Sequence, residues 1–312
     1  EAGEDPKALE CIPMLKRSDI KREAAKIINE ELTVDDSLFL YHDVCTNGIG
    51  YVDLMFKTDS IAPEQIPYLG LLKSVLGYVD TENYTYGELF NEINANTGGI
   101  SCGVEVFDRA DSTEEFQAMF SVRGKALYTK MDFLFKMIGE ILNSSKLEDT
   151  KRLYEIVASV KSRAQVNLTG AGHSTAVLRA AAYSSPMAAF QDEMAGIGYY
   201  QFIEKLEKDF EQRKEETVEE LCKLMKEILR PENFMISYTG ERESLETVQK
   251  LAKAVKAGLG TEPVERSEEK LTCTKKNEGF KTSGQVQYVA QTGNFKKKGL
   301  EYTGALEILK VI

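Results

Sequence analysis

One short stretch of the sequence carries the residue types of a catalytic nucleophile. The run Gly172-His173-Ser174-Thr175-Ala176 resembles the G-x-S-x-G turn of serine hydrolases, with alanine in the last place. That turn needs a strand before the serine and a histidine after it in chain order. Here the preceding residues have apolar positions three and four apart, which predicts a helix, and no histidine follows residue 173. A serine hydrolase that uses Ser174 is therefore disfavoured.

Metal chemistry has few candidate ligands in this sequence. There are only two histidines, His42 and His173, and neither lies in an H-x-x-E-H motif or its inverse. His42 falls on a predicted strand, where a hydrogen-bonded structural histidine is the favoured interpretation. The five cysteines are odd in number and have no C-x-x-C spacing, which is typical of reduced thiols. We expect no metal site within this chain.

Charge and hydropathy exclude several classes of partner. The chain has 312 residues, with 39 Lys plus Arg against 50 Asp plus Glu, and a net charge of −11. An acidic chain is a poor binder of nucleic acid or of anionic membranes. No apolar run approaches the roughly 18 residues of a membrane span, and no signal peptide is recognisable. We expect no nucleic acid or membrane partner and a cytoplasmic location, with an organelle matrix as the alternative.

The elements predicted for the first half group strands and helices separately. Residues 1–35 are polar and are expected to be a lead-in with a helix over 18–31. Alternating residues predict strands at 38–44 and 49–56, and Asn47-Gly48 between them predicts a hairpin. Helical spacing follows Pro63 and recurs over 86–96. Further strands are expected at 100–107 and 115–123.

The second half is predicted to be mainly helical. A short strand at 233–239 is expected before a helix at 243–257, and then a charged linker over 259–277. A strand at 285–291 and an apolar helix at 303–312 follow, so we expect the chain to be a section of a longer polypeptide. The remaining helices are expected at 125–143, 148–166, 173–184, 196–210 and 214–229.

This grouping predicts an α+β fold in which an antiparallel sheet packs against helices. The expected domains are a lead-in at 1–35, one complete α+β domain at 36–258, a linker at 259–277, and the truncated start of a second α+β domain at 278–312.

Several short motifs in order resemble one family of enzymes. The turn Asp80–Tyr84 and the run Asn96-Thr97-Gly98-Gly99 are similar to a half-domain of pitrilysin/insulinase metallopeptidases. The detailed match is to the presequence-protease and falcilysin branch, in the peptidase-associated region that begins the C-terminal half. It rests on residues 42–49, 97–101 and 122–127, and on Gly172-His173-Ser174 followed by Arg179-Ala180 and Ala182-Tyr183.

The resemblance implies a LuxS/processing-peptidase-like metallohydrolase fold and a two-half enzyme that closes around an unfolded peptide. In that family the first domain binds zinc through H-x-x-E-H and a downstream Glu, and the last domain supplies Arg and Tyr to the substrate. The implied partners are therefore an N-terminal catalytic half and unfolded peptide substrates, and the implied cofactor is zinc in the full-length enzyme.

The helix that corresponds to the zinc helix departs from the family pattern. Leu71, Ser74 and Val75 stand where the catalytic domain has His, Glu and His. Such side chains cannot hold zinc or lower the pKa of a bound water. We therefore expect no catalytic residue and no cofactor in this chain, which would be inactive alone.

The helix after Gly172 carries the remaining candidate site residues. His173, Arg179 and Tyr183 are candidate contacts to the chamber or the peptide, and Arg179 and Tyr183 share one helix face. The alternative is that Arg179 and Tyr183 pin this helix against its neighbour, and this interpretation is favoured.

Two hypotheses for function follow from the resemblance. The first is a non-catalytic section of a zinc metalloendopeptidase that degrades unstructured peptides in a closed chamber. The second is a catalytically dead structural or interaction subunit of the same fold, like a processing-peptidase partner or a respiratory core subunit. An upstream H-x-x-E-H motif would favour the first.

Overall fold

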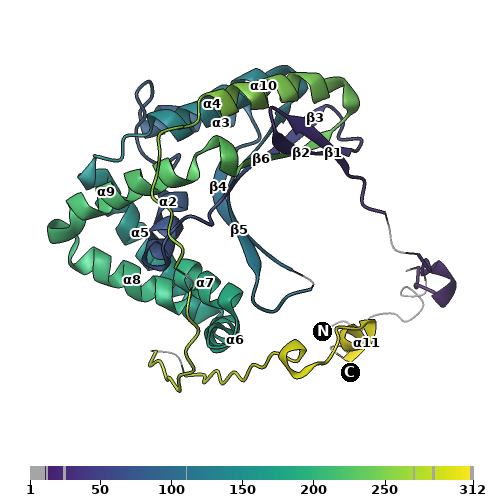
Figure 1. Ribbon diagram of the computed structural model, residues 1–312, viewed down its shortest axis with the longest axis vertical. Coiled ribbons are helices and arrows are strands. Elements are labelled where there is room, and N and C mark those ends of the chain that lie inside the picture. The colour runs from purple at the N-terminus through teal and green to yellow at the C-terminus, as the bar shows by residue number, and fades with distance from the viewer. Residues whose placement is uncertain are drawn as a thin grey trace.

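The computed structural model describes residues 11, 13–23, 26–109, 111–269, 271–282 and 285–309. Its centre is a six-stranded sheet with the order β1-β2-β6-β3-β5-β4 (Figure 1). The parallel pair is β2 and β6, and all other neighbours are antiparallel. The α+β class is confirmed, but the expectation of a wholly antiparallel sheet is wrong at that pair. The strands are β1 Glu30–Val34, β2 Ser37–Asp43, β3 Ile49–Lys57, β4 Ile100–Asp108, β5 Phe116–Leu127 and β6 Phe234–Gly240.

The first hairpin of the sheet joins β1 to β2. Its two turn residues, Asp35 and Asp36, both have positive φ, at 45° and 63°. This is the backbone that a two-residue hairpin turn requires, and aspartate tolerates it better than most residues. The helix predicted over 18–31 is wrong in its described part, which holds only the 3₁₀ turn Arg17–Asp19 and the start of β1. Residues 24 and 25 of that prediction lie outside the described ranges.

The predicted hairpin between β2 and β3 is also wrong, because β6 lies between these strands. Ile236 pairs with Phe39 on one side and with Leu54 on the other. Asn47 and Gly48 do form a left-handed turn, with φ of 53° and 80°. The Glu241 carboxylate, just after β6, accepts hydrogen bonds from the backbone N–H groups of this turn at 3.1–3.4 Å. The turn thus bends the chain away and leaves room for β6.

The helices lie on one face of the sheet and beyond its β4 end. In Figure 1, α4 and α10 run along one face, and α5 to α9 gather beside α2. A helix at 186–195 was not predicted; Ser185 caps it and Pro186 opens it. The helices are α2 Ile66–Val75, α3 Tyr86–Asn96, α4 Met131–Ser144, α5 Thr150–Gly170, α6 Gly172–Ala182, α7 Pro186–Ala195, α8 Ile197–Lys208, α9 Phe210–Ile228, α10 Leu245–Ala257 and α11 Gly304–Leu309.

Alternation along the strands decides which face is covered. In β3, Val52, Leu54 and Phe56 are buried against the helices, while Tyr51 is exposed on the opposite face. Burial of these apolar side chains is the main favourable contribution to folding. Among the described residues, no helix is long and apolar enough to cross a bilayer.

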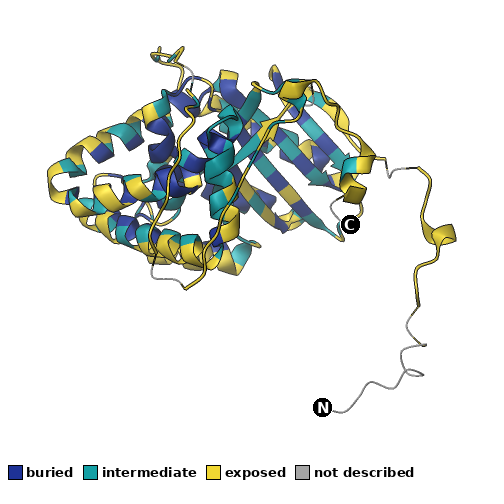
Figure 2. Cartoon of the chain, turned by 90° about the horizontal axis from the view of Figure 1, so that it is seen from below, coloured by how far each residue is buried: buried dark blue, intermediate teal, exposed yellow. Residues whose placement is uncertain are grey.

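The chain after α10 crosses the surface without joining the sheet. Figure 2 shows that this segment is mostly exposed, whereas buried residues line the sheet and the inner sides of the helices. The predicted strand at 285–291 is wrong, since these residues form no strand. The predicted last helix is confirmed as α11 within its described part, and residues 310–312 lie outside it. The division into domains stays a prediction.

Candidate functional site

The helix predicted to replace a zinc helix is α2, and two of its three key positions are fully buried. Leu71 and Val75 have no exposed surface and belong to the hydrophobic core. Ser74 is half-buried, and its hydroxyl donates to the Gly70 carbonyl oxygen at 3.4 Å. These side chains offer a cation neither charge nor a free ligand pair, so this position of α2 does not fit zinc.

Other metal ligands do not gather elsewhere in the described part of the chain. Within it, no three His, Cys, Asp or Glu side chains come together in a way that could hold a metal ion. His42 is engaged on its strand: Nδ1 donates to the Ile28 carbonyl oxygen at 2.8 Å, and Nε2 lies 3.2 Å from the Ser237 hydroxyl. The prediction of a hydrogen-bonded strand histidine is confirmed.

Arg179 on α6 is the centre of a charged cluster that joins three segments. Its Nη1 donates to Oδ2 of Asp192 on α7 at 2.5 Å. Its Nε and Nη2 donate to the two carboxylate oxygens of Glu278 at 2.9 and 3.2 Å. Burial lowers the pKa of Arg179, but the hydrogen bonds to Glu278 and Asp192 outweigh it and raise the pKa. The guanidinium is therefore a permanent charge that fastens α6 to α7 and to the C-terminal segment.

Asp192 connects this cluster to the next helix. Its side chain is almost completely buried, with 2% of its surface exposed. Its carboxylate accepts from the backbone N–H groups of Ile197 and Gly198 at 3.0 and 3.2 Å, at the first turn of α8. A carboxylate at this end satisfies free N–H groups and suits the helix dipole. Arg179 thus neutralises a buried charge whose other role is to begin α8.

The other two predicted contacts of α6 also meet the C-terminal segment. The Tyr183 hydroxyl donates to Glu278 at 2.5 Å. Hydrogen bonds from Arg179 and Tyr183 lower the pKa of Glu278. His173 lies beside Tyr288, with ring centroids 6.3 Å apart, and a Cβ at Gly172 would come within 2.4 Å of the Tyr288 ring. The contacts around Arg179 and Tyr183 are those of a pinned helix, and a contact of His173, Arg179 or Tyr183 to peptide stays a prediction.

The serine motif does not have the backbone that a nucleophile would need. Ser174 lies in the first turn of α6, and α5 ends only two residues before that helix begins. Helix precedes it where the hydrolase turn requires a strand. The low rank given to Ser174 agrees with this geometry.

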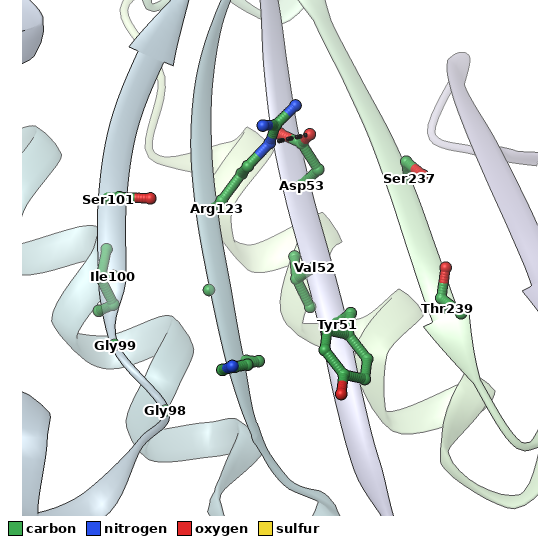
Figure 3. A pocket seen from close by; sticks show the side chains of 12 residues that line it. Tyr51, Val52, Asp53, Gly98, Gly99, Ile100, Ser101, Arg123, Ser237 and Thr239 are labelled. Carbon is green, nitrogen blue, oxygen red and sulfur yellow. Dashed lines mark hydrogen bonds and ion pairs between the residues drawn. The ribbon is translucent and has the colours of Figure 1, made fainter. Parts of the chain in front are cut away.

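A polar hollow on the open face of the sheet was not predicted. It has a volume of about 480 Å³ and lies across β4, β5, β3 and β6 (Figure 3). Arg123 from β5 donates to Asp53 on β3 at 2.8 Å and to Glu105 on β4 at 3.1 Å. The hydrogen bond to Asp53 is the main reason that the pKa of Arg123 is raised. The complete lining is Tyr51, Val52, Asp53, Gly98, Gly99, Ile100, Ser101, Arg123, Gly124, Lys125, Ser237 and Thr239.

This hollow offers hydrogen-bond donors and acceptors of both charges along three neighbouring strands. One carboxylate oxygen of Asp53, Oδ1, is buried and has no hydrogen-bond partner among the described residues. The signal for the hollow is present in the sequence as alternating polar residues in two strands, such as Asp53 in β3 and Arg123 in β5. Only the pairing of β3 with β5 brings these two side chains together.

The comparisons with known proteins agree with the expected family. Residues 1–206 match the peptidase-associated family of subfamily C of the M16 peptidases. The chain is 37% identical over 304 residues to "Protein HypA" of Clostridium perfringens, covering 97% of this chain and 31% of that protein. It is 27% identical over 313 residues to "Presequence protease 1, chloroplastic/mitochondrial" of Arabidopsis thaliana, covering 99% of this chain and 29% of that protein.

A third relative and one solved structure have similar descriptions. "Presequence protease, mitochondrial" of Yarrowia lipolytica is 29% identical over 225 residues, covering 72% of this chain and 22% of that protein. The crystal structure of a peptidase M16 inactive domain from Pseudomonas fluorescens has a TM-score of 0.49 and 13% identity, covering 77% of this chain and 53% of that one.

The match extends over most of the chain but over a small part of its relatives. The chain spans about a third of the length of the first two relatives. The family match covers residues 1–206, and the first relative aligns along nearly all of the chain. The predicted presequence-protease branch is confirmed by these relatives, and the chain belongs to the peptidase-associated family of subfamily C of the M16 peptidases.

Proposed function

We propose that this chain is a non-catalytic section of the C-terminal half of a zinc metalloendopeptidase that degrades unstructured peptides. The observation that carries the proposal is the content of α2. In a chain of this family, Leu71 and Val75 are core residues where a catalytic domain has its zinc-binding histidines. Zinc and the residue that activates water are then supplied by an N-terminal catalytic half. This section alone is inactive.

The open face of the sheet is the surface that we assign to the chamber wall. It presents Tyr51, Arg123 and Lys125 together with hydroxyl groups from β6. Donors and acceptors spread over several strands suit an unfolded peptide, whose backbone groups are unpaired along its whole length. We place the protein in the bacterial cytoplasm, with an organelle matrix as the alternative. Two relatives carry "mitochondrial" in their names.

The test is a complementation assay with a quenched, unstructured peptide of about 20–30 residues. Zinc-dependent cleavage is measured for the catalytic half, for this section extended to the natural end of the polypeptide, and for their mixture. Cleavage in the mixture alone is expected. Full activity of the catalytic half alone would instead favour the catalytically dead interaction subunit. Cleavage by this section alone would overturn our assignment of α2.

A pair of variants tests the chamber wall within the active mixture. Arg123→Gln removes a cation from the open face and is expected to raise KM with little change in kcat, because it removes a binding contact. Arg109→Gln is the matched control, since Arg109 is an exposed arginine paired with Asp111 and Glu115 beyond the end of β4. Equal KM values for the two variants would contradict this assignment of the face.

A further inference from the structure

β4 is an edge strand whose outer side is unpaired. It is the last strand of the sheet, and β5 is its one neighbour. In an antiparallel pair, about half of the backbone groups of each strand point away from the partner. No backbone hydrogen bond from the described part of the chain reaches that side of β4. A long unpaired edge of this kind is a template for another strand.

A groove runs along this free edge. It has a volume of about 430 Å³ and extends from Gly99 to Glu105 on the strand side. The opposite side is built by α2, the turn after it, α3 and α5. Phe90 and Tyr78, both lining residues, are 58% and 54% exposed. Its lining residues are Lys73, Ser74, Leu76, Gly77, Tyr78, Phe90, Ile93, Asn94, Gly99, Ile100, Ser101, Cys102, Gly103, Val104, Glu105, Ile141 and Arg163.

The groove contains two cations that have no carboxylate partner within ion-pair distance among the described residues. These are Lys73 on α2 and Arg163 on α5. The acidic residue of the lining, Glu105, forms its ion pair with Arg123. Burial lowers the pKa of Lys73, and the charge of Glu105 offsets this only in part. A partly buried ammonium without a counter-charge is unfavourable, so an incoming carboxylate would gain from it.

The groove therefore combines main-chain hydrogen-bonding groups, exposed aromatic surface and unpaired positive charge. These three features are complementary to an extended peptide: its backbone pairs with β4, its apolar side chains cover Phe90 and Tyr78, and its carboxylate meets the cations. The positive charge selects against a basic peptide and for an acidic one. This local charge is opposite to the net charge of −11 of the whole chain.

We propose that an extended peptide segment with an acidic side chain adds to the free edge of β4 as a further strand, its carboxylate lying between Lys73 and Arg163. This β4-edge groove is separate from the hollow on the open face, where Asp53 and Arg123 already pair with each other. The proposal is independent of the proposed function, because it needs neither zinc nor a catalytic half.

The test is a binding titration with the 312-residue chain and a defined probe. The probe is a fluorescein-labelled, amidated decapeptide of alternating valine and threonine with glutamate at its two central positions. Adjacent residues of a strand point to opposite faces, so one glutamate faces the cations in either register. Saturable binding by fluorescence anisotropy is expected. Exchanging both glutamates for glutamine is expected to weaken binding about fivefold.

Protein variants test the role of the two cations. Lys73→Gln and Arg163→Gln are each expected to weaken binding of the probe about threefold to fivefold. The matched control is Lys151→Gln, an exposed position on α5, the same helix as Arg163, about 18 Å away at 1.5 Å per residue. Circular dichroism melting verifies that each variant is folded. Equal affinities for Lys73→Gln, Arg163→Gln and Lys151→Gln would overturn the charge assignment.

Hydrogen exchange tests the strand addition itself. Bound probe is expected to slow exchange of backbone amides in residues 100–108, and a probe with N-methyl groups on alternate residues is expected to lose both this protection and its affinity. Binding without protection of β4 would overturn the proposal. Protection that grows with protein concentration in the absence of probe would also overturn it, because a second copy would then occupy the edge.

Discussion

At the residue scale, two carboxylates of this protein work by accepting many hydrogen bonds in places where the chain must turn. Asp192 receives the first N–H groups of α8 and one arm of Arg179. Glu241 receives the N–H groups of the turn between β2 and β3. Neither residue was singled out in the sequence, because each acts on groups that are distant in the chain or defined only by the backbone conformation.

Removing the charge of Arg179 should expose the cost of the buried Asp192 carboxylate. The Arg179 side chain is 13% exposed, and Asp192 has no other cation in its described hydrogen bonds. We expect Arg179→Gln to lower the free energy of unfolding by about 2–4 kcal/mol, measured by urea denaturation. The control Arg109→Gln breaks an exposed ion pair and should change the stability little. Similar losses in both variants would show that Asp192 does not depend on Arg179.

The pH dependence of stability should reveal Glu241. The Tyr128 hydroxyl and the backbone N–H groups of the turn lower the pKa of Glu241 from 4.5 to about 2. A carboxylate with a lowered folded-state pKa stabilises the fold above its unfolded pKa, and this contribution is lost as pH falls towards the folded value. The difference in unfolding free energy between the wild type and Glu241→Gln should therefore be full at pH 7 and shrink between about pH 4.5 and pH 2.

Urea denaturation at a series of pH values measures that difference. Glu219→Gln provides the comparison at pH 7, since Glu219 is exposed on α9 and no hydrogen bond or ion pair is described for it. It should cost little. If the Glu241→Gln difference stayed constant down to about pH 2, the turn would not depend on the ionised carboxylate.

At the element scale, α2 is held by close backbone approach as well as by its apolar side chains. A Cβ at Gly70 would lie 2.6 Å from the Met194 carbonyl oxygen and 2.8 Å from the Tyr199 ring. The helices α7 and α8 therefore pack directly on the backbone of α2. This contact places the helix that carries Leu71, Ser74 and Val75 deep among its neighbours.

Two glycine substitutions separate packing from helix propensity. Gly70→Ala is expected to lower the free energy of unfolding by about 1–3 kcal/mol, because the new methyl group overlaps backbone. Gly87→Ala on α3 is expected to raise it by about 0.5–1 kcal/mol, since a Cβ there meets nothing within 4 Å and alanine favours helix. Thermal and urea unfolding of both variants measure the two effects. A stabilising Gly70→Ala would contradict the close packing of α2.

Local patterns predicted most elements, but they failed where pairing was decided by distant residues. The helix at 86–96 agrees with α3, whose Thr85–Glu88 capping box is written in the sequence. The Asn47-Gly48 turn is real, yet its strands accept β6 between them, which no local pattern contains. Likewise, the candidate residues of α6 were identified correctly as a cluster, but their partner Glu278 lies 99 residues after Arg179.

At the scale of the whole molecule, one cluster ties the chain after α10 to the helices. Arg179 and Tyr183 hold Glu278, and Gly172 leaves space for Tyr288. Farther along, Lys297 donates to the Ser184 carbonyl oxygen at 2.9 Å and pairs with Glu114 at 2.6 Å. An otherwise exposed segment therefore follows a defined course across α6 (Figure 1).

Limited proteolysis should detect this attachment. Glu278→Gln removes the charge that Arg179 and Tyr183 bind, so trypsin should cleave at the nearby Lys276 and Lys281 about fivefold faster. Glu268→Gln makes the same change at an exposed position of the same segment, for which no ion pair is described, and should leave the rate unchanged. Initial rates measured by mass spectrometry compare the two. Equal rates would show that the segment is held by other contacts.

The position of β6 also has a consequence for the order in which the protein can form during synthesis. Tyr41 of β2 pairs with Tyr238, so almost two hundred residues must follow β2 before its second partner exists. At about 5–20 residues per second, the ribosome needs roughly 10–40 seconds to supply it. Throughout that interval β2 and β3 are strands with an open side towards each other. A nascent chain of this protein has to avoid the direct β2–β3 hairpin, and its sheet can close only after the helices α2 to α9 have been made.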